Sequence, residues 1–189
     1  MTTIYKHAAA VAVIIAGSMS AAETTEKPRP IEKLNKPMES NAGMAQLEAA
    51  HLDMFDDLDF KVFSGQQWTE LHRSHSQDVV VHWPDGRTTK GLDKHIEDLK
   101  ALFAWAPDTR IEIHPVKVAK GAWTAVIGVM EGTFTRPMTL PDGSVIQPTS
   151  KPYTITMATF SHWTDAGTMD EEFLFWDNAS LNRQIGLGK

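Results

Sequence analysis

Asp177 is the first residue of this sequence to consider for proton-transfer chemistry. It closes a segment in which Phe173 and Phe175 occupy the same alternating positions. A carboxyl group among aromatic rings loses solvation, which raises its pKa and suits it to take up and return a proton near neutral pH. Asp177 also precedes residues 178–180 (NAS), where an aspartate would be a good N-cap for a closing helix. The two roles are compatible, because one carboxylate oxygen can cap the helix while the other faces a cavity.

Histidines form the second group of candidates. His82 lies within an otherwise apolar segment, with Val81 and Trp83 expected on the opposite face of a strand. Histidine titrates near neutral pH, so His82 could carry a proton or hold an enolate oxygen; a core histidine bonded to the backbone is the alternative. His95 falls on the apolar stripe of a helix and needs either a cavity or a buried partner. His162 either lines the same cavity or points to solvent.

Two strand glutamates and several aromatic residues extend the set. Glu131 shares an alternating face with Trp123 and could be a pocket acid, although an exposed strand glutamate is the commoner outcome. Glu172 stands at an odd separation from Asp177, so it is expected on the opposite face in a structural role. Tryptophans such as Trp83 and Trp123 are expected to build the core and the cavity wall, which would favour a flat, apolar ligand.

Metal binding receives less support from the sequence. His72 and His75 are three positions apart on an expected helix, and His82 follows closely. A typical site needs a third or fourth ligand, and no HExxH pattern is present, so we expect no metal. The absence of cysteine excludes disulfides, thiol catalysis and Cys-ligated zinc. The sequence also contains no GxSxG motif and no nucleotide-binding glycine loop.

Helical periodicity is confined to the first part of the domain and to its end. A capping-box pair, Ser64 and Gln67, is expected to begin the second helix. Apolar residues at helical spacing predict helices over 44–58, 64–75 and 92–103, with a closing helical segment over 181–185.

Between the third and the closing helix the periodicity changes to two. Alternation and turn residues predict strands over 78–83, 108–119, 122–134, 151–163 and 168–177, with a small hairpin at 141–143. Helices that precede a run of strands indicate an α+β fold, in which N-terminal helices pack on one face of a curved antiparallel sheet. We expect a cone-shaped domain that encloses a pocket where the two layers diverge.

The N-terminus has the pattern of a secretory signal. Lys6 precedes an apolar run over residues 8–16, and Ser20-Ala21-Ala22 then offers small residues for cleavage after Ala22. The apolar run is too short for a membrane span, which needs roughly 20 residues. We therefore expect a signal peptide (1–22), a proline-containing, extended or disordered tether (23–43), a domain over 44–189, and a periplasmic or secreted location. A buried N-terminal helix is the alternative.

The charge of the chain restricts its partners. The formal net charge is −6, and loss of Lys6 with the signal would make it −7 (−6 minus 1). An acidic chain is a poor ligand for nucleic acid or for an anionic membrane surface. We therefore expect neither nucleic acid nor, after signal cleavage, a membrane as partner.

Four segments, taken together, resemble a known family. They are VHWPDGRTTKG (81–91), LKALFAWAPDTRIEI (99–113), MEGTFTRPM (130–138) and EEFLFWDNASLNRQIGL (171–187). Their order and spacing resemble the ester-cyclase branch of the SnoaL-like polyketide cyclases, which belong to the nuclear transport factor two-like superfamily. The likeness covers about residues 44–187. It is more specific for fold than for function, because this fold hosts isomerases, cyclases, hydrolases and binding proteins.

The resemblance implies a homodimer without metal or organic cofactor. Characterised members close a ring by intramolecular aldol condensation, with an acidic residue late in the sheet as acid and base. Asp177 matches that position, and His82 matches a histidine or polar position common in the family. The expected catalytic residues are thus Asp177 and His82, and the expected binding residues are His95, Trp83, Glu131, His162, Trp123 and Phe175.

Three functions are compatible with these observations. The first is an exported, cofactor-free enzyme that performs aldol-type cyclisation or isomerisation next to a carbonyl group of a small apolar or aromatic molecule. The second is a periplasmic protein of the same fold that binds such a molecule without chemistry. The third is an assembly module that dimerises through its open sheet face. An export signal departs from polyketide tailoring, which uses substrates made in the cytoplasm, and so leaves the substrate class open.

Overall fold

The computed structural model of the chain describes residues 41–140 and 142–188. The expected signal peptide and residues 23–40 of the expected tether lie outside these ranges. Helix α1 (Asn41–Asp57) begins three residues before the expected domain boundary. None of the helices in the described part of the chain is long and apolar enough to cross a membrane.

The helices differ from expectation mainly after α1. A π-helical segment, η1 (Leu58–Phe63), follows directly on α1, and the expected second helix over 64–75 is replaced by a shorter 3-10 helix, η2 (Trp68–Arg73). Ser64 does not begin a helix but is the C-cap of η1, and its hydroxyl donates to the Asp59 carbonyl at 2.6 Å and accepts from the Ile111 N–H at 2.8 Å. The remaining helices are α2 (Leu92–Trp105) and α3 (Asn178–Gln184).

The strands form one large sheet and a small hairpin. The large sheet contains β1 (His75–His82), β2 (Thr88–Lys90), β3 (Arg110–Ile111), β4 (Val116–Lys120), β5 (Trp123–Thr133), β8 (Pro152–Trp163) and β9 (Met169–Phe175). Its order is β2-β1-β9-β8-β5-β3, and β4 also pairs with β5. The expected strand over 108–119 is thus interrupted between β3 and β4. The expected hairpin is present as β6 (Met138–Thr139) and β7 (Val145–Ile146).

One pairing departs from the expected antiparallel sheet. β1 pairs with β9 in parallel, with Val81 opposite Glu172 and a register shift between His75 and Val80. All other pairings in the large sheet are antiparallel. The sheet is therefore mixed but mostly antiparallel, because β9 returns beside the first strand of the domain after the long β5–β8 pair has been built.

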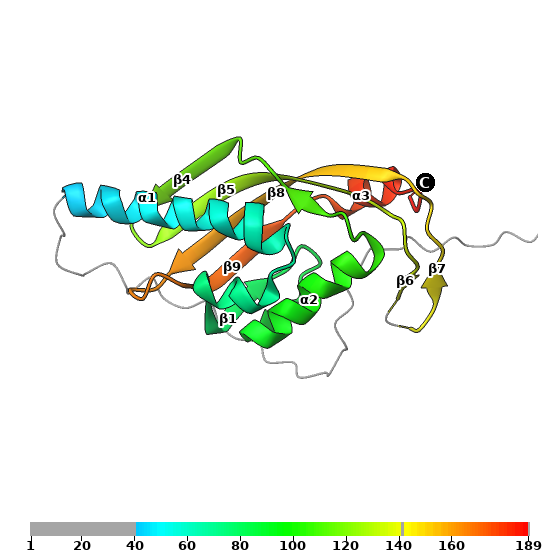
Figure 1. The fold of residues 1–189 in the computed structure, drawn as a ribbon, viewed down its shortest axis with the longest axis horizontal. Coiled ribbons are helices and arrows are strands. Elements are labelled where there is room, and N and C mark those ends of the chain that lie inside the picture. Colours follow the sequence, from blue (N-terminus) through cyan, green and yellow to red (C-terminus); the bar gives the residue numbers. More distant parts are fainter. Residues whose placement is uncertain (1–40, 141, 189) are drawn as a thin grey trace, which may run out of the picture.

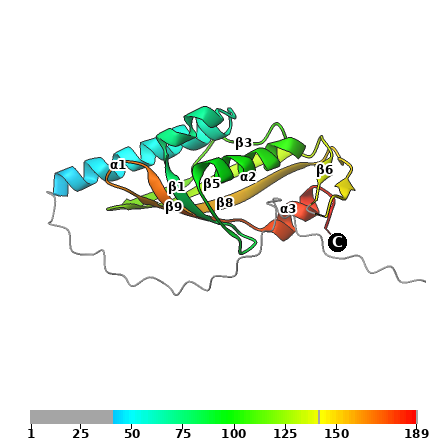
Figure 2. The same cartoon turned by 90° about the horizontal axis from the view of Figure 1, so that it is seen from below.

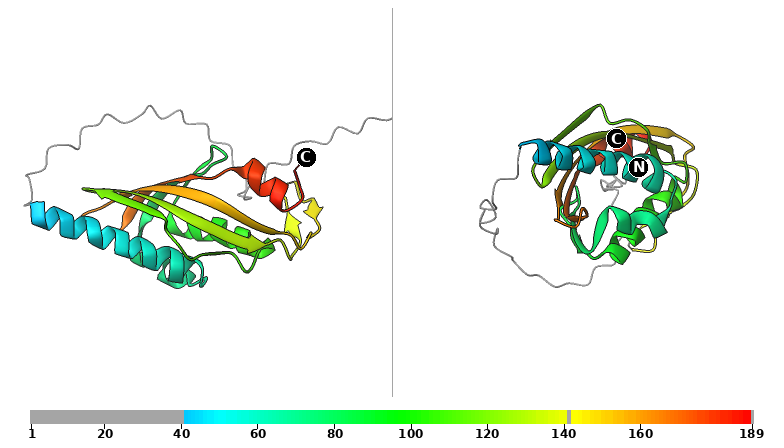
Figure 3. Two further views of the ribbon diagram at one scale, coloured as in Figure 1. Left: turned by 90° about the horizontal axis from the view of Figure 1, so that it is seen from above. Right: turned by 60° about the vertical axis from the view of Figure 1, so that its left-hand side comes forward.

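The sheet is curved, and its helices lie on one side of it. Figures 1 and 2 show α1 and α2 against the same face, while α3 and the β6–β7 hairpin close the end near the C-terminus. The end-on view in Figure 3 shows that the sheet curves toward the side on which the helices lie. The α+β fold predicted from the sequence is confirmed.

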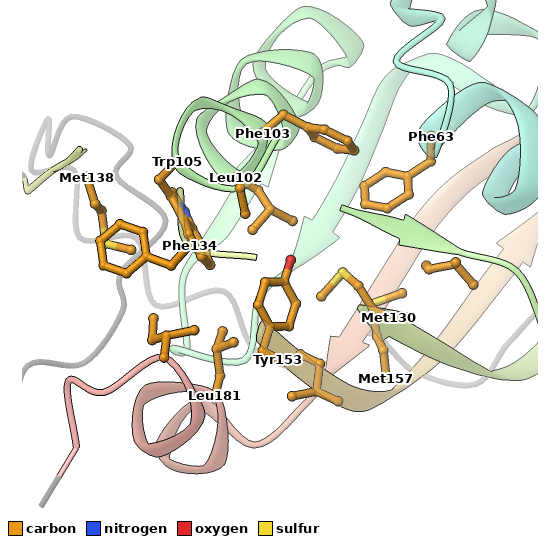
Figure 4. Packing of buried hydrophobic residues seen from close by; sticks show 14 residues of the cluster. Phe63, Leu102, Phe103, Trp105, Met130, Phe134, Met138, Tyr153, Met157 and Leu181 are labelled. Carbon is orange, nitrogen blue, oxygen red and sulfur yellow. The ribbon is translucent and has the colours of Figure 1, made fainter. Parts of the chain in front are cut away.

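The largest hydrophobic cluster lies at the end of the sheet that α3 covers. Side chains from α2, β5, β8 and α3 converge there, and Trp105 packs edge-on against Phe134 with ring centroids 5.5 Å apart (Figure 4). The Tyr153 hydroxyl is buried with them and lies 2.7 Å from the Thr109 hydroxyl. A second cluster under α1 contains Phe55, Leu71 and Trp163 among others. Residues of both clusters line a cavity between the helices and the sheet.

Candidate functional site

A cavity that is partly open to solvent lies between the concave face of the sheet and the helices. Its walls come from η1, α2 and strands β1, β5, β8 and β9, among other segments. Most of the lining is apolar, which is typical of sites that hold a small organic molecule. The polar side chains in the wall are Asp59, His75, His95, Asp98, Thr159 and Glu172.

Three of these polar side chains form a compact buried group. His75 begins β1, His95 lies in the first turn of α2, and Glu172 lies in β9; they are 2%, 3% and 4% exposed. Glu172 Oε2 is 3.8 Å from His75 Nε2 and 3.6 Å from His95 Nε2. The parallel pairing of β1 with β9 brings the first and third elements together, and α2 packs over them. We call His75, His95 and Glu172 the buried triad.

The protonation of His75 follows from its second ring nitrogen. His75 Nδ1 lies 3.0 Å from Ser74 Oγ and 3.4 Å from the Leu71 carbonyl oxygen. The Ser74 hydroxyl donates its hydrogen to the same carbonyl at 3.2 Å. Both neighbours of Nδ1 are therefore acceptors, so Nδ1 carries a hydrogen and Nε2 faces the Glu172 carboxylate.

Burial and charge act in opposite directions on the triad. Burial favours the neutral form of Glu172, but His75 and His95 outweigh it and hold the pKa of this carboxyl group below its usual range. Burial lowers the pKa of His95 to about 4, although the nearby Glu172 opposes this shift. At neutral pH the cavity thus contains an ionised carboxylate beside a neutral imidazole. Such a carboxylate can accept a proton, and an adjacent imidazole can hydrogen-bond to a developing oxyanion.

A second polar group enters the cavity from η1. Its π-helical turn directs Asp59 into the wall, and Asp59 Oδ2 is 2.8 Å from His114 Nε2. His114 Nδ1 is 2.7 Å from Asp56 Oδ1, and Asp56 also pairs with Lys117 nearer the surface. Burial raises the pKa of Asp59 despite its bond to His114. Burial opposes the charged form of His114 as well, but the hydrogen bonds and charges of Asp59 and Asp56 raise its pKa above the usual value.

Two of the expected binding residues line the cavity. Trp83 is 5% exposed and contributes to the wall, with its Nε1–H donating to Thr89 Oγ1 at 2.9 Å. His95 lies in the wall near it, with ring centroids 5.8 Å apart. The sequence left open whether His95 faces a cavity or has a buried partner. Both are the case, because His95 lines the cavity and its Nε2 lies 3.6 Å from Glu172 Oε2.

The two expected catalytic residues lie outside the cavity. Asp177 accepts a hydrogen bond from the Ser180 N–H at 3.0 Å as the N-cap of α3, and its side chain is 63% exposed. His82 lies on the outer face of the sheet, stacked on Phe173 and bonded to Glu171 at 3.0 Å. Its neighbours in sequence, Val81 and Trp83, take the inner face of β1 because they are the more apolar pair. These positions give no support to a catalytic role for Asp177 or His82.

The other expected binding residues also lie on the outer face of the sheet. Glu131 pairs with Arg110, and His162 Nδ1 is 2.5 Å from Asp170 Oδ1. Trp123 and Phe175 are 43% and 52% exposed. None of these four residues is part of the cavity lining, which is built by the alternate positions of the same strands.

The sequence interpretation did not identify Asp59; it gave Glu172 a structural role and considered His75 only as part of a weakly supported metal site. Alternation along 168–177 left two possible inner faces, and the aromatic pair Phe173 and Phe175 favoured the wrong one. The available signal was a charged residue, Glu172, spaced in register with Leu174 and Trp176, both of which line the cavity. His75 was expected on a helix, so its proximity to a strand carboxylate could not be anticipated.

Comparison with known proteins agrees with this architecture. Residues 49–185 match the family model described as SnoaL-like polyketide cyclase. Among solved structures, a candidate SnoaL-like polyketide cyclase from Jannaschia sp. CCS1 is similar, with a TM-score of 0.65 at 15% identity over 76% of this chain and 96% of that one. IdmH, a candidate polyketide cyclase from Streptomyces antibioticus, gives 0.61 at 21% identity over 72% and 98%. A SnoaL-like polyketide cyclase from Agrobacterium tumefaciens gives 0.53 at 19% over 76% and 98%. No curated protein is similar to the chain at a significant level.

The His114 network should make stability depend on pH. The raised pKa of His114 means that its stabilising effect is complete below the ordinary histidine pKa of about 6.5 and is lost as pH rises through the folded-state value. We expect His114→Gln to lower the free energy of unfolding more at about pH 6 than at about pH 8.5, as measured by urea denaturation. His72→Gln is the control, because that ring is exposed and its Nδ1 lies 2.7 Å from the uncharged Thr69 carbonyl oxygen. An equal loss at both pH values for His114→Gln would contradict the charged network.

Proposed function

Because the chain belongs to the SnoaL-like polyketide cyclase family, we propose that it performs acid–base chemistry next to a carbonyl group of an apolar small molecule held in the cavity. The reaction class is aldol-type ring closure or double-bond isomerisation. One observation carries this proposal: the Glu172 carboxylate, 4% exposed, lies beside two histidines in a mostly apolar wall. A desolvated base with a nearby hydrogen-bonding imidazole is what enolate formation requires.

In the proposed reaction Glu172 is the base. Its carboxylate takes a proton from the carbon next to the carbonyl group, and the C–H electron pair forms the enolate. An N–H of His95 donates to the enolate oxygen. In ring closure, the enolate carbon attacks a second carbonyl carbon, and the Glu172 carboxylic acid returns its proton to the new alkoxide. The step is balanced without an external oxidant or reductant.

The residues that line the cavity favour an apolar, flat substrate. Trp83 and Trp176 meet edge to face there, with ring centroids 6.4 Å apart, and Leu99, Leu102 and Met157 complete much of the surface. Aromatic rings and aliphatic side chains bind such molecules mainly through buried apolar area. Binding without chemistry would use the same wall, so the experiment below separates the two functions.

The outer face of the sheet supports association with a second copy of the chain. Exposed apolar side chains gather on β4, β5, β8 and β9, and their outward positions follow from the strand register. They include Val116, Val118, Trp123, Phe160 and Phe175, which are 43–56% exposed. A continuous exposed apolar surface of this kind is typical of an interface. We propose that the protein is a homodimer through this face.

Export is also part of the proposal. The basic, apolar and small-residue order of residues 6–22 supports a cleavable signal, and the Cys-free domain needs no oxidative folding. N-terminal sequencing of the chain recovered from the periplasm or medium should begin at Glu23. An intact Met1 in a cytoplasmic fraction would contradict export.

Glu172→Gln tests the proposed chemistry. Proton abstraction can be measured without knowing the product, as protein-dependent deuterium incorporation from D₂O into aryl ketones and fused-ring β-keto esters, followed by NMR. We expect Glu172→Gln to lower the exchange rate by about 10²–10⁴-fold, because the amide cannot accept the proton.

Glu171→Gln is the matched control. Glu171 is the adjacent residue, but it faces outward and bonds to His82, so exchange should persist. Retention of exchange in Glu172→Gln would refute Glu172 as the base. If the compounds quench tryptophan fluorescence while the unaltered protein exchanges none of them, the protein is a binder.

Phe160→Ser combined with Phe175→Ser tests the dimer. Removing two aromatic side chains from the outer face should convert the dimer to a monomer in light scattering coupled to size exclusion, because the apolar contact area is lost. Val145→Ser is the control, since Val145 is 51% exposed on the β6–β7 hairpin, away from this face. A dimer that survives the double substitution would place the interface elsewhere.

A further inference from the structure

We propose that the buried triad is a binding site for a divalent transition-metal cation of the zinc class. His75 Nε2, His95 Nε2 and Glu172 Oε2 would be the protein ligands. This inference goes beyond the proposed function, whose chemistry uses no metal. It concerns the cation that balances the negative charge of the buried Glu172 carboxylate when no substrate is bound.

The distances between the donor atoms fit one ion. The three donor atoms all lie within 4.8 Å of one another, and the two nitrogen-to-oxygen separations are 3.8 and 3.6 Å. A tetrahedral zinc ion with bonds near 2.0–2.1 Å holds its ligand atoms roughly 3.3–3.5 Å apart. The observed separations are too long for direct hydrogen bonds. Small inward movements of the side chains would bring them to coordination distance.

His75 already has the orientation of a metal ligand. Its Nδ1–H is directed at Ser74 Oγ and the Leu71 carbonyl, as deduced above. Histidine ligands usually donate their second ring N–H to a carbonyl or similar acceptor, which fixes the tautomer and turns the other nitrogen toward the ion. In the neutral ring, the Nε2 lone pair therefore points at a carboxylate oxygen. Two electron pairs that face each other in a buried site repel, and a metal ion bound between them would remove that repulsion.

Two of the three donor atoms are buried without a hydrogen bond. Neither His75 Nε2 nor Glu172 Oε2 makes a hydrogen bond within the described residues, although both are buried. Asp98 in the same wall provides a contrast, because Lys94 Nζ lies 3.2 Å from its carboxylate. No lysine or arginine of residues 41–140 and 142–188 forms such a pair with Glu172. Burying a carboxylate without a permanent cation beside it costs free energy, and a bound metal ion would offset that desolvation cost.

The donor set selects the class of metal. Two imidazole nitrogens and one carboxylate oxygen suit zinc and its first-row neighbours, whereas magnesium and calcium prefer oxygen ligands alone. Three protein ligands leave a coordination position that faces the cavity, as in zinc sites open to small molecules. The bound ion would occupy Glu172 Oε2, the atom that the proposed proton transfer requires, so the metal-loaded form should be the inactive one.

Zinc titration of the full chain tests the site without any substrate. Protein stripped with EDTA and dialysed is titrated with ZnCl₂ by calorimetry, and cobalt(II) is added separately to record its visible absorption. We expect one zinc per chain and a tetrahedral cobalt spectrum. Ser74→Ala should weaken zinc binding about 10–100-fold through loss of the His75 orientation, and Glu172→Gln should weaken it by at least about 100-fold.

His82→Gln is the matched control. His82 and Glu171 form an exposed His–Glu pair with atoms 3.0 Å apart, so ordinary surface binding of zinc would depend on that pair as much as on the triad. Zinc affinity that falls in the triad variants and persists in His82→Gln supports the site. No zinc binding, or equal binding in all variants with circular dichroism unchanged, would overturn it. Deuterium exchange by the metal-free protein tests the proposed function separately, so failure of one does not imply failure of the other.

Discussion

The need to compensate one buried carboxylate connects most of this structure. Taking the Glu172 side chain out of water costs several kcal/mol unless charge or hydrogen bonds replace the lost solvation. The compensating groups, His75 and His95, come from the start of β1 and the first turn of α2. Their convergence requires β9 to lie beside β1 in parallel and α2 to cover both strands. A stable apolar core alone would not demand this arrangement, so the carboxylate is better explained by function than by stability.

Strand alternation then divides β9 between two tasks. Glu172 and Leu174 face the cavity, whereas Glu171, Phe173 and Phe175 face outward. The inner positions supply the proposed chemistry, and the outer positions supply an apolar surface that a second chain could cover. Since the period of a strand is two, a register shift of one residue would exchange these faces and abolish both. The regular antiparallel pairing of β8 with β9 over residues 158–162 and 171–175 protects against that shift.

The fold could be predicted from the sequence much further than the site could. Turn residues and the change of periodicity located most strands, the β6–β7 hairpin and α2, because those signals are local. Assigning a face to each strand is not local: over residues 173–176 aromatic residues point to both faces, and only the partner layers decide which face is inside. Trp83 and His95 were identified because they stand on clearly apolar faces. The proximity of Glu172 to His75 was not predicted, because it depends on the parallel pairing of β1 with β9, which no local pattern encodes.

The pKa values of two carboxyl groups in the cavity wall, those of Asp59 and Glu172, are shifted in opposite directions. Burial raises the pKa of Asp59, whereas His75 and His95 hold that of Glu172 below its usual range despite burial. Pairs of titratable groups whose environments separate their pKa values are the usual basis for dividing acid and base roles. Glu172 therefore has the properties of a base or a metal ligand, both of which need the ionised form. Asp59 is the more easily protonated of the two, and His114 and Asp56 connect it toward the surface.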